Sequence, residues 1–373
     1  MNLQDLKVTR KTVAKSARRV DDNDVIAGYY RQLFTDTARE TLLNRAESVE
    51  GCFKLWSVDH YRRQKVKDIK RINLCKDKFC MNCQNVLSKQ RYAKYKPVLD
   101  ELLRDKDIYH IVFTVPNCDG SELVGTLDRM YKKFPYIIRY FQGERKCRGV
   151  DFAGYGFTGA VRSLEITTKL TGNRTVEYHP HFHCLFVLRK GIDGKRKHVN
   201  DFSYHRNPQT GAVRLRRKYT DLEVLLQKSW YLFYNDERLT AESLAALDQG
   251  YSVTADLAKG NYKEVFKYAV KGDTKNDSMT DVIFNYDVFE TLYNALHRRR
   301  VMQGYGVLNR YDFETVTGEE VEKVYEEIRA ILREVEQPEE QLLRLEEVFA
   351  DLEHDDITYI SKSAIRQYLN DSD

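Results

Sequence analysis

Two long strand-like segments follow one another near the middle of the chain. The first covers residues 156–170 (GFTGAVRSLEITTKL) and the second covers residues 176–188 (VEYHPHFHCLFVL), and a TGNRT segment joins them. Gly172 and Asn173 in that joint are residue types that favour the backbone conformations of a tight turn. The pattern therefore predicts a β-hairpin whose two strands pair antiparallel.

The second strand carries three of the nine histidines of the chain within five positions. His181 and His183 are two residues apart, so both imidazoles emerge on the same face of a strand. The apolar run from 185 to 188 that follows indicates burial. Two buried imidazoles that face one another cannot both be charged, and the neutral form binds metals. The spacing predicts half of a metal site, and a packed pair without a ligand is the alternative.

The first strand offers a third ligand. Ser163, Glu165 and Thr167 share one face, and Glu165 is the only acidic residue of that strand. A carboxylate among apolar neighbours is costly unless it has a cation. Glu165 is therefore expected to complete the metal site, with His179 as the reserve candidate because it has the same parity as the pair.

Charge is distributed unevenly along the chain. The formal charge is +5, but residues 319–373 hold 17 acidic and 6 basic side chains, so residues 1–318 carry +16. A body this basic favours a polyanionic partner, because Lys and Arg that neutralise phosphates release counterions. A merely solvated surface is the alternative. No apolar stretch approaches the roughly 18 residues of a membrane span, and the polar start lacks a signal-peptide core. We therefore expect a cytoplasmic protein with no membrane partner.

Composition and pattern divide the chain into three parts. Residues 1–104 are basic and are expected to be mostly helical, without strands, with a cysteine group and a helix interrupted near Pro97. Residues 105–310 hold the strand-like runs and the helices between them. Residues 319–373 are predicted to form an acidic module of two helices broken at Pro338.

The segment GNYKEVFKYAVKG, residues 260–272, has the length of a short helix between two glycines. On such a helix Glu264, Lys267, Tyr268 and Lys271 would share one face, opposite the apolar residues. Ordinary surface ion pairs are one interpretation. The other is catalytic: a divalent cation on a phosphate and nearby lysines favour attack by the phenolate of Tyr268, which leaves a covalent phosphotyrosine.

The sequence resembles the rolling-circle replication initiator (Rep) proteins of small plasmids, in the single-tyrosine branch of the HUH endonuclease superfamily. Five stretches in the family's order carry the resemblance: FTVPN (113–117), VRSLEITTK (161–169), YHPHFHCLF (178–186), EVFKYAVK (264–271) and, more loosely, RRRVMQGYGVL (298–308). It implies an α+β fold, with helices packed on a central antiparallel sheet of about five strands. Residues 105–310 would form this HUH domain, between the helical N-terminal segment and the acidic module.

The resemblance also implies an enzyme that nicks one strand of a plasmid origin, at a single-stranded or hairpin site. Tyr268 would attack the scissile phosphate and stay on the 5′ end, leaving a 3′-OH that primes synthesis. His181, His183 and Glu165 would hold Mg²⁺ or Mn²⁺ against the phosphate. Lys271 would steady the phosphate.

Position 264 distinguishes two branches of such enzymes. Two-tyrosine relatives place a second tyrosine four residues before the nucleophile, where this chain has Glu264. In the single-tyrosine branch this glutamate activates water at termination, so the last strand is hydrolysed. Lys267 and Arg162 are assigned to nucleic-acid binding. A host helicase and polymerase are implied partners, and a homodimer is compatible with this function.

The cysteines partly follow the same family. Such initiators often carry an N-terminal Arg-x-Cys-Pro-x-Cys segment, and CKDKFCMNC departs from it at the arginine and the proline. Cys75, Cys80 and Cys83 lie in this stretch, and Cys52 would complete the four thiolates of a structural Zn²⁺ site. Free buried thiols are the alternative, because the spacing is irregular.

Other functions remain compatible with the same residues. Two histidines and a carboxylate also form the iron site of non-haem oxygenases, which would not need Tyr268. A zinc-dependent DNA-binding regulator would use the histidines structurally and form no covalent adduct. Relaxases and single-tyrosine transposases share the chemistry and differ in substrate.

Overall fold

The structure is a computed structural model. It describes residues 22–52, 55–61, 66–72, 74–171, 175–192, 194–207, 210–266, 269–272, 282–309 and 352–358, together with residues 19 and 279. Contacts group the chain into two compact units. The first comprises residues 1–90, 274–290 and 315–373, and the second comprises residues 91–273 and 291–314. None of the helices in the described ranges is long and apolar enough to cross a membrane.

The first unit contains a three-stranded antiparallel sheet. It also contains a helix over residues 22–37 and α2 (Thr41–Glu50). The sheet has the order β11-β1-β2, from Leu352–Thr358, Leu55–Tyr61 and Val66–Ile72.

These three strands differ from the expectation of an N-terminal region without strands and a helical acidic module. Four of the seven β2 residues are charged, which hides the strand pattern. One of the two partners of β1, the strand β11, is about three hundred residues away in the sequence, so local periodicity could not indicate that pairing. The two predicted helices around Pro338 lie outside the described residues.

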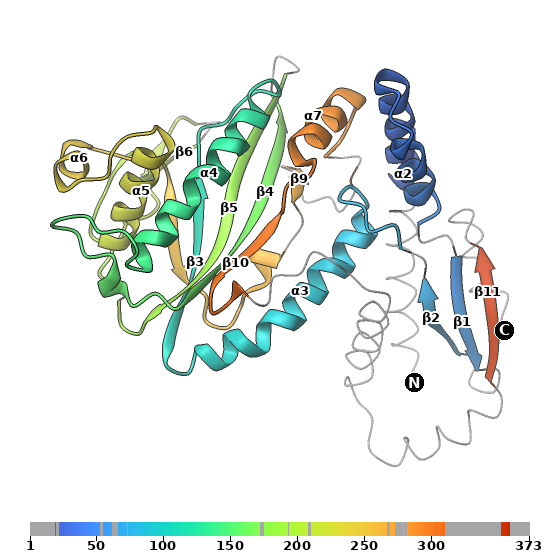
Figure 1. Cartoon of the computed structure of the whole chain (residues 1–373), viewed down its shortest axis with the longest axis horizontal. Helices are drawn as coiled ribbons and strands as arrows, with labels where there is room; N and C mark the ends of the chain where they lie inside the picture. The colour runs from blue at the N-terminus through green and yellow to red at the C-terminus, as the bar shows by residue number, and fades with distance from the viewer. Residues whose placement is uncertain are drawn as a thin grey trace, which may run out of the picture. The chain divides into compact units, whose positions relative to one another are not determined.

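The second unit is built on a larger sheet with the order β10-β4-β5-β3-β8, to which β9 adds a short parallel strand beside β4 (Figure 1). The five strands of the main path pair antiparallel. Their bounds are Lys106–Thr114 (β3), Gly159–Leu170 (β4), Val176–Arg189 (β5), Val253–Leu257 (β8), Val270–Gly272 (β9) and Met302–Gly306 (β10). The predicted α+β class with a central antiparallel sheet is confirmed.

The β4–β5 pair is the predicted hairpin. Its register places Glu165 opposite His181 and Ser163 opposite His183. Residues directly opposite in an antiparallel pair point to the same face, so the carboxylate and both imidazoles share one side of the sheet. The turn at residues 172–174 lies outside the described residues.

The other face of the sheet is covered by α4 (Leu123–Phe141) and α5 (Asp221–Tyr234). Figure 1 shows α4 crossing this face. The ring of Phe134 on α4 packs edge-on against Phe182 of β5 at 5.3 Å, and the indole of Trp230 on α5 donates to the carbonyl of Thr114 at 2.8 Å. Each fully buried ring contributes about 2 kcal/mol through burial alone. These contacts fix β5 from behind, opposite the histidines.

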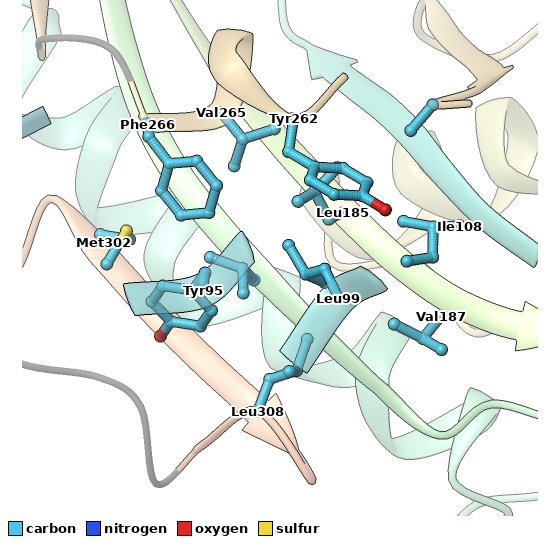
Figure 2. Packing of buried hydrophobic residues seen from close by; sticks show 12 residues of the cluster. Tyr95, Leu99, Ile108, Leu185, Val187, Tyr262, Val265, Phe266, Met302 and Leu308 are labelled. Atoms are coloured by element: carbon cyan, nitrogen blue, oxygen red, sulfur yellow. The ribbon is translucent and has the colours of Figure 1, made fainter. Parts of the chain in front are cut away.

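The histidine face is covered at one end by the C-terminal part of α3 (Met81–Leu102) and by η3, a 3-10 helix over Lys263–Phe266. Figure 2 shows Tyr95 and Leu99 of α3 packed with Phe266 over Leu185 of β5. α3 continues through Pro97, where the sequence predicted an interruption. The buried cluster leaves the other end of β5, with His181 and His183, outside it.

The segment 260–272 differs from the predicted single helix. It contains η3 and then β9, which pairs with β4 in parallel from Ile166 to Thr168. Its apolar residues are nonetheless buried, as the pattern predicted: Tyr262, Val265, Phe266, Ala269 and Val270. Burial of these five residues is compatible with a single helix and also with η3 followed by β9. A short segment that docks on a sheet is stabilised more by tertiary contacts than by helix propensity, so the contacts with the sheet decide its conformation. Lys267 and Tyr268 lie outside the described residues.

Candidate metal-dependent active site

The structure brings together the three predicted metal ligands, Glu165, His181 and His183. Their ligand atoms all lie within 4.8 Å of one another. His181 Nε2 is 3.2 Å from Glu165 Oε1, and His183 Nε2 is 3.7 Å from Glu165 Oε2. The two Nε2 atoms are 3.1 Å apart. Three donors therefore converge on one point from two neighbouring strands, as a cation site requires.

Burial and charge favour ionised Glu165. Only 5% of its surface is exposed. Burial opposes ionisation, but the adjacent imidazoles of His181 and His183 outweigh it and hold the pKa of the Glu165 carboxyl below its ordinary value. The site thus presents a carboxylate at neutral pH, which is the form that binds divalent cations.

The orientation of His181 follows from its second nitrogen. Its Nδ1 lies 3.0 Å from the backbone carbonyl of His179. A carbonyl only accepts, so the proton of neutral His181 is on Nδ1 and the lone pair on Nε2 faces the site. The side chain of His179, the reserve candidate, is not a member of the ligand group among the described residues.

The structure adds one residue that the sequence did not indicate, His110 on β3. Its Nε2 lies 2.9 Å from Nδ1 of His183, and the two rings stack at 5.1 Å. Burial, reinforced by the charge of His183, lowers the pKa of His110 to about 4. Neutral His110 can accept the Nδ1 proton of His183, which leaves the Nε2 lone pair of His183 directed at the site.

The alternation of side chains along β3 was the one feature of the sequence that could have indicated a role for His110. His110, Val112 and Thr114 lie on a single face of β3, the strand that leads into the FTVPN stretch. Only the register, which sets Val112 opposite His183, shows that this is the histidine face. Local sequence does not contain that register, because β3 and β5 are separated by about seventy residues.

The η3 segment lies beside the site. η3 contacts β4 and β5, and the backbone N–H of Ile166 donates to the carbonyl of Ala269 at 2.8 Å. Glu264 is exposed, and its carboxylate acts on His110 by raising its pKa, against the larger effect of burial. Glu264 is therefore within electrostatic reach of the histidine group. The side chain of Lys271 lies outside the described residues, as do Lys267 and Tyr268.

Arg162 requires a correction. The residue was expected to contact nucleic acid, but only 1% of its surface is exposed. Its guanidinium lies 4.3 Å from the ring centre of Tyr131 and 4.7 Å from that of Phe182, and it donates to Gln303. Arg162 thus lies on the opposite face of β4 from Glu165, enclosed by α4. The alternation along the strand already separated positions 162 and 165, so the pattern contained the signal.

The four cysteines of the first unit also come together. The Sγ atoms of Cys52 and Cys83 are 3.5 Å apart, as are those of Cys75 and Cys83, and Cys80 lies 3.7 Å from Cys52. A tetrahedral zinc site with Zn–S bonds of about 2.3 Å has S···S edges of about 3.8 Å. The observed separations fit that geometry.

Backbone amides also point at these sulfurs. The N–H groups of Cys75, Lys76 and Asp77 donate to the Sγ atoms of Cys52, Cys83 and Cys75, at 3.2–3.4 Å. Lys76 has φ +58, which turns the chain around the cluster. Hydrogen bonds from the other three thiols hold the pKa of Cys80 below its usual value. Such donors stabilise thiolates, the form that binds metal.

The fold and the candidate site together point to a class of protein. An α+β unit whose antiparallel sheet presents paired histidines and a carboxylate on one face is consistent with the HUH endonuclease fold that the resemblance implies. In comparison with protein families, residues 66–201 match the model of a replication protein family. The match supports the resemblance to rolling-circle plasmid replication initiators over β2 to β5 and all three candidate ligands, and the single-tyrosine branch stays a prediction. The comparison with curated proteins finds no match, and neither does the comparison with solved structures.

Proposed function

We propose that this chain initiates rolling-circle replication of a plasmid by nicking one strand of origin DNA in a metal-dependent reaction. The observation that carries the proposal is the convergence of Glu165, His181 and His183 on one face of the sheet, beside η3. The match to a replication protein family favours DNA as the substrate over the substrates of an iron oxygenase.

The donor set fits a divalent cation. Two neutral imidazoles and one carboxylate would hold Mg²⁺ or Mn²⁺ and leave coordination positions open for a phosphate oxygen. When bound, such an ion provides Lewis-acid stabilisation of the charge that develops on the scissile phosphate. His110 and the carbonyl of His179 orient the two imidazoles for this task.

Tyr268 is proposed as the nucleophile. Its phenol loses a proton as its oxygen bonds to phosphorus, and the bond from phosphorus to the 3′ oxygen of the preceding nucleotide breaks. That oxygen takes up a proton and becomes the 3′-OH primer, while the 5′ phosphate stays on the tyrosine. The new phosphodiester retains the energy of the broken one, so the step is reversible. Lys271 and Lys267 are proposed to offset the phosphate charge.

The described neighbours of Tyr268 in the chain support this assignment. Phe266, two residues before it, is fully buried in the cluster of Figure 2 against β5. Ala269, the next residue, accepts a hydrogen bond from Ile166, which is adjacent to Glu165 on β4. The segment that contains the tyrosine is thus attached to the same two strands that carry the metal ligands.

Glu264 is proposed to act at termination. It is exposed, and its carboxylate influences His110 electrostatically. In this role it accepts a proton from a water molecule, whose oxygen attacks the phosphotyrosine and frees both the tyrosine and the 5′ phosphate of the DNA. The enzyme would then be released after one round.

The remaining proposals concern the first unit and the partners. We propose that Cys52, Cys75, Cys80 and Cys83 hold a structural Zn²⁺, supported by the sulfur separations. Origin DNA is the partner that the family match implies. A host helicase and polymerase, and a second copy of the chain, are further proposed partners.

The proposed function is tested by trapping the covalent product. The protein is incubated with labelled single-stranded origin DNA and Mn²⁺, separated on a denaturing gel, and digested for mass mapping of the modified peptide. We expect one DNA adduct on the peptide that contains residues 264–271. A modified residue elsewhere, or cleavage without an adduct, would contradict the proposal.

A further inference from the structure

A small β-ribbon projects from the second unit. β6 (Tyr204–Arg206) and β7 (Val213–Leu215) pair antiparallel, with Tyr204 opposite Leu215 and Arg206 opposite Val213. All six residues are exposed, and half of the surface of Tyr204 and of Leu215 is accessible. A two-stranded ribbon alone is marginal in water, and exposed apolar side chains add to its cost. A binding partner would account for both features.

The base of the ribbon is firmly attached to the unit. Ser203, immediately before β6, is fully buried, and its carbonyl accepts from the N–H groups of Arg216 and Arg217 at 2.7 and 3.1 Å. The Arg217 guanidinium donates to Asp256 of β8 and to Glu223, which is fully buried on α5. The ribbon therefore extends from a fixed base, so its side chains have a defined direction.

The ribbon and its flanks are strongly basic. Residues 194–218 contain eight Lys and Arg and one acidic residue, Asp201. Of the eight, Arg196, Lys197 and Arg217 pair with acidic side chains of the unit. Among the described residues, no acidic side chain pairs with the exposed Arg206 or Arg214. These guanidiniums remain available for a negatively charged partner.

We propose that the β6–β7 ribbon enters the major groove of duplex DNA beside the nick site and reads base edges there. The major groove admits a two-stranded β-ribbon, and arginine donates to guanine O6 and N7 in a bidentate manner. Arg206 supplies such a group on the ribbon face that also carries Val213 and Leu215, whose side chains match the thymine methyl that the same groove presents. Arg214, opposite His205 on the other face of the ribbon, is placed for the phosphates that flank the groove. This inference rests on the proposed function, since it takes origin DNA as the partner.

The position of the ribbon relative to the metal ligands fits this role. Arg217 binds Asp256, whose register partner on β3 is His110, and His110 bonds to His183. Between β5 and β8 lie two strand spacings, or roughly 10 Å. DNA held by the ribbon would therefore adjoin the phosphate at the metal site.

Single-stranded DNA fits the ribbon less well. Proteins bind single strands in grooves lined by several aromatic platforms, whereas the two ribbon strands carry a single aromatic ring of that kind, Tyr204. Strand pairing with a second copy of the chain would use an exposed edge, but each ribbon strand has only three residues. Duplex DNA is therefore the favoured partner.

The test uses selection from a pool of random duplexes of about 25 base pairs, which exceeds two helical turns. Wild type and Arg206→Ala/Arg214→Ala are each allowed to bind the pool, and the bound DNA is sequenced. We expect the wild type to enrich a site with guanines that the double variant no longer selects, and we expect affinity for that site to fall about tenfold or more. Lys146→Ala/Arg148→Ala, which removes two exposed charges after α4, should select the wild-type site.

A second variant separates base reading from simple charge. Arg206→Lys/Arg214→Lys keeps both charges but loses the bidentate geometry, so it should keep the salt dependence and lose guanine selectivity. If it selects the wild-type site, base reading by the ribbon is overturned. The same holds if the alanine variant selects the wild-type site, or if it only converts a dimer into a monomer on sedimentation. Unchanged thermal melting verifies that the variants are folded.

The outcome is independent of the catalytic proposal. If the wild type selects a duplex site through the ribbon but forms no phosphotyrosine, the proposed chemistry fails and the ribbon assignment stands. If it forms the phosphotyrosine but the ribbon variants select normally, the reverse holds.

Discussion

The Nε2 atom of His110 lies 2.9 Å from Nδ1 of His183, so one hydrogen bond links β3 to the candidate metal ligands on β5. The two rings are nearly parallel, with an interplanar angle of 12°. The contact fixes both the rotation of the His183 ring and the location of its proton. His183 then presents Nε2 toward His181 and Glu165, and the site is organised before any ligand binds.

We predict that His110→Ala weakens Mn²⁺ binding about 10- to 100-fold, because loss of such an outer partner frees the ring and the tautomer of the ligand. Calorimetric titration of the metal-free protein with Mn²⁺ measures the effect. His110→Gln should recover part of the affinity, since its amide oxygen can accept the His183 proton.

The matched control for that experiment is His179→Ala. The ring of His179 lies 5.0 Å from that of His181, yet the atom that orients His181 is the backbone carbonyl, which the substitution retains. Mn²⁺ affinity should therefore change little. Equal loss of affinity in His110→Ala and His179→Ala would show that His110 contributes only general packing.

We predict that the metal-free protein loses stability as the pH falls from about 6.5 to about 4. Burial lowers the pKa of His110 to about 4 in the folded state, whereas an unfolded histidine titrates near 6.5. Between these values the unfolded chain binds one proton more than the folded chain, so acidification favours unfolding, by up to about 3 kcal/mol. Denaturant titrations in EDTA across this range measure the loss.

His110→Gln provides the comparison for the pH experiment, because it cannot take up the proton. Its stability should depend less on pH between 6.5 and 4 than that of the wild type. The carboxyl of Glu165, whose pKa is lowered in the folded state, contributes a further loss below its ordinary range and is present in both proteins. Identical pH curves for the two proteins would exclude His110 as the titrating group.

The sequence alone was sufficient to predict the β4–β5 hairpin. Alternation along two adjacent runs defines a face, a short joint makes the strands neighbours, and the cost of a buried carboxylate singles out Glu165. The strand-like runs and helices expected between residues 105 and 310 are found there as β3, β8, α4 and α5.

Relationships between distant segments could not be predicted in this way. The link between His110 and His183 depends on the register of β3 with β5, and β11 pairs with a strand near the other end of the chain. The apolar spacing of residues 260–272 fits a helix, so the sequence predicted one helix over the whole segment. In the structure the helical part is confined to residues 263–266, and the segment ends as β9, which pairs with β4.

We predict that Tyr268→Phe abolishes cleavage of a single-stranded origin oligonucleotide and the covalent adduct, while DNA binding stays within a few-fold of the wild type. The substitution removes the attacking oxygen and leaves the ring. Denaturing gels and fluorescence anisotropy measure the two quantities. Tyr262→Phe, a buried tyrosine of the same segment, should cleave normally. Normal cleavage by Tyr268→Phe would end the assignment.

We predict that Glu264→Gln nicks its first strand but accumulates protein-bound DNA, because the amide cannot accept a proton from water. A time course of adduct formation and release measures this. Lys263→Ala, an exposed neighbour on η3, should release DNA at the wild-type rate. Equal release by Glu264→Gln would assign termination to another group.

We predict that the purified protein contains one Zn²⁺ and that Cys80→Ser loses it. Four thiolates at tetrahedral separations bind zinc far more tightly than three, because a serine hydroxyl is a poor replacement for the lost thiolate ligand. Metal analysis by mass spectrometry measures the content, and the melting temperature of the variant should fall, as should that of the wild type treated with a strong chelator.

The control for zinc is Cys118→Ser, which alters a buried cysteine in the second unit whose thiol donates to the carbonyl of Tyr178. A hydroxyl can make the same bond, so both zinc content and melting temperature should stay close to the wild type. Chelation should also act selectively on the first unit, because the second unit contributes no cysteine to the cluster. The zinc prediction would be wrong if the protein contained no zinc and melted at the same temperature with and without chelator. The four cysteines would then be a packed group of thiols that accept hydrogen bonds from backbone amides.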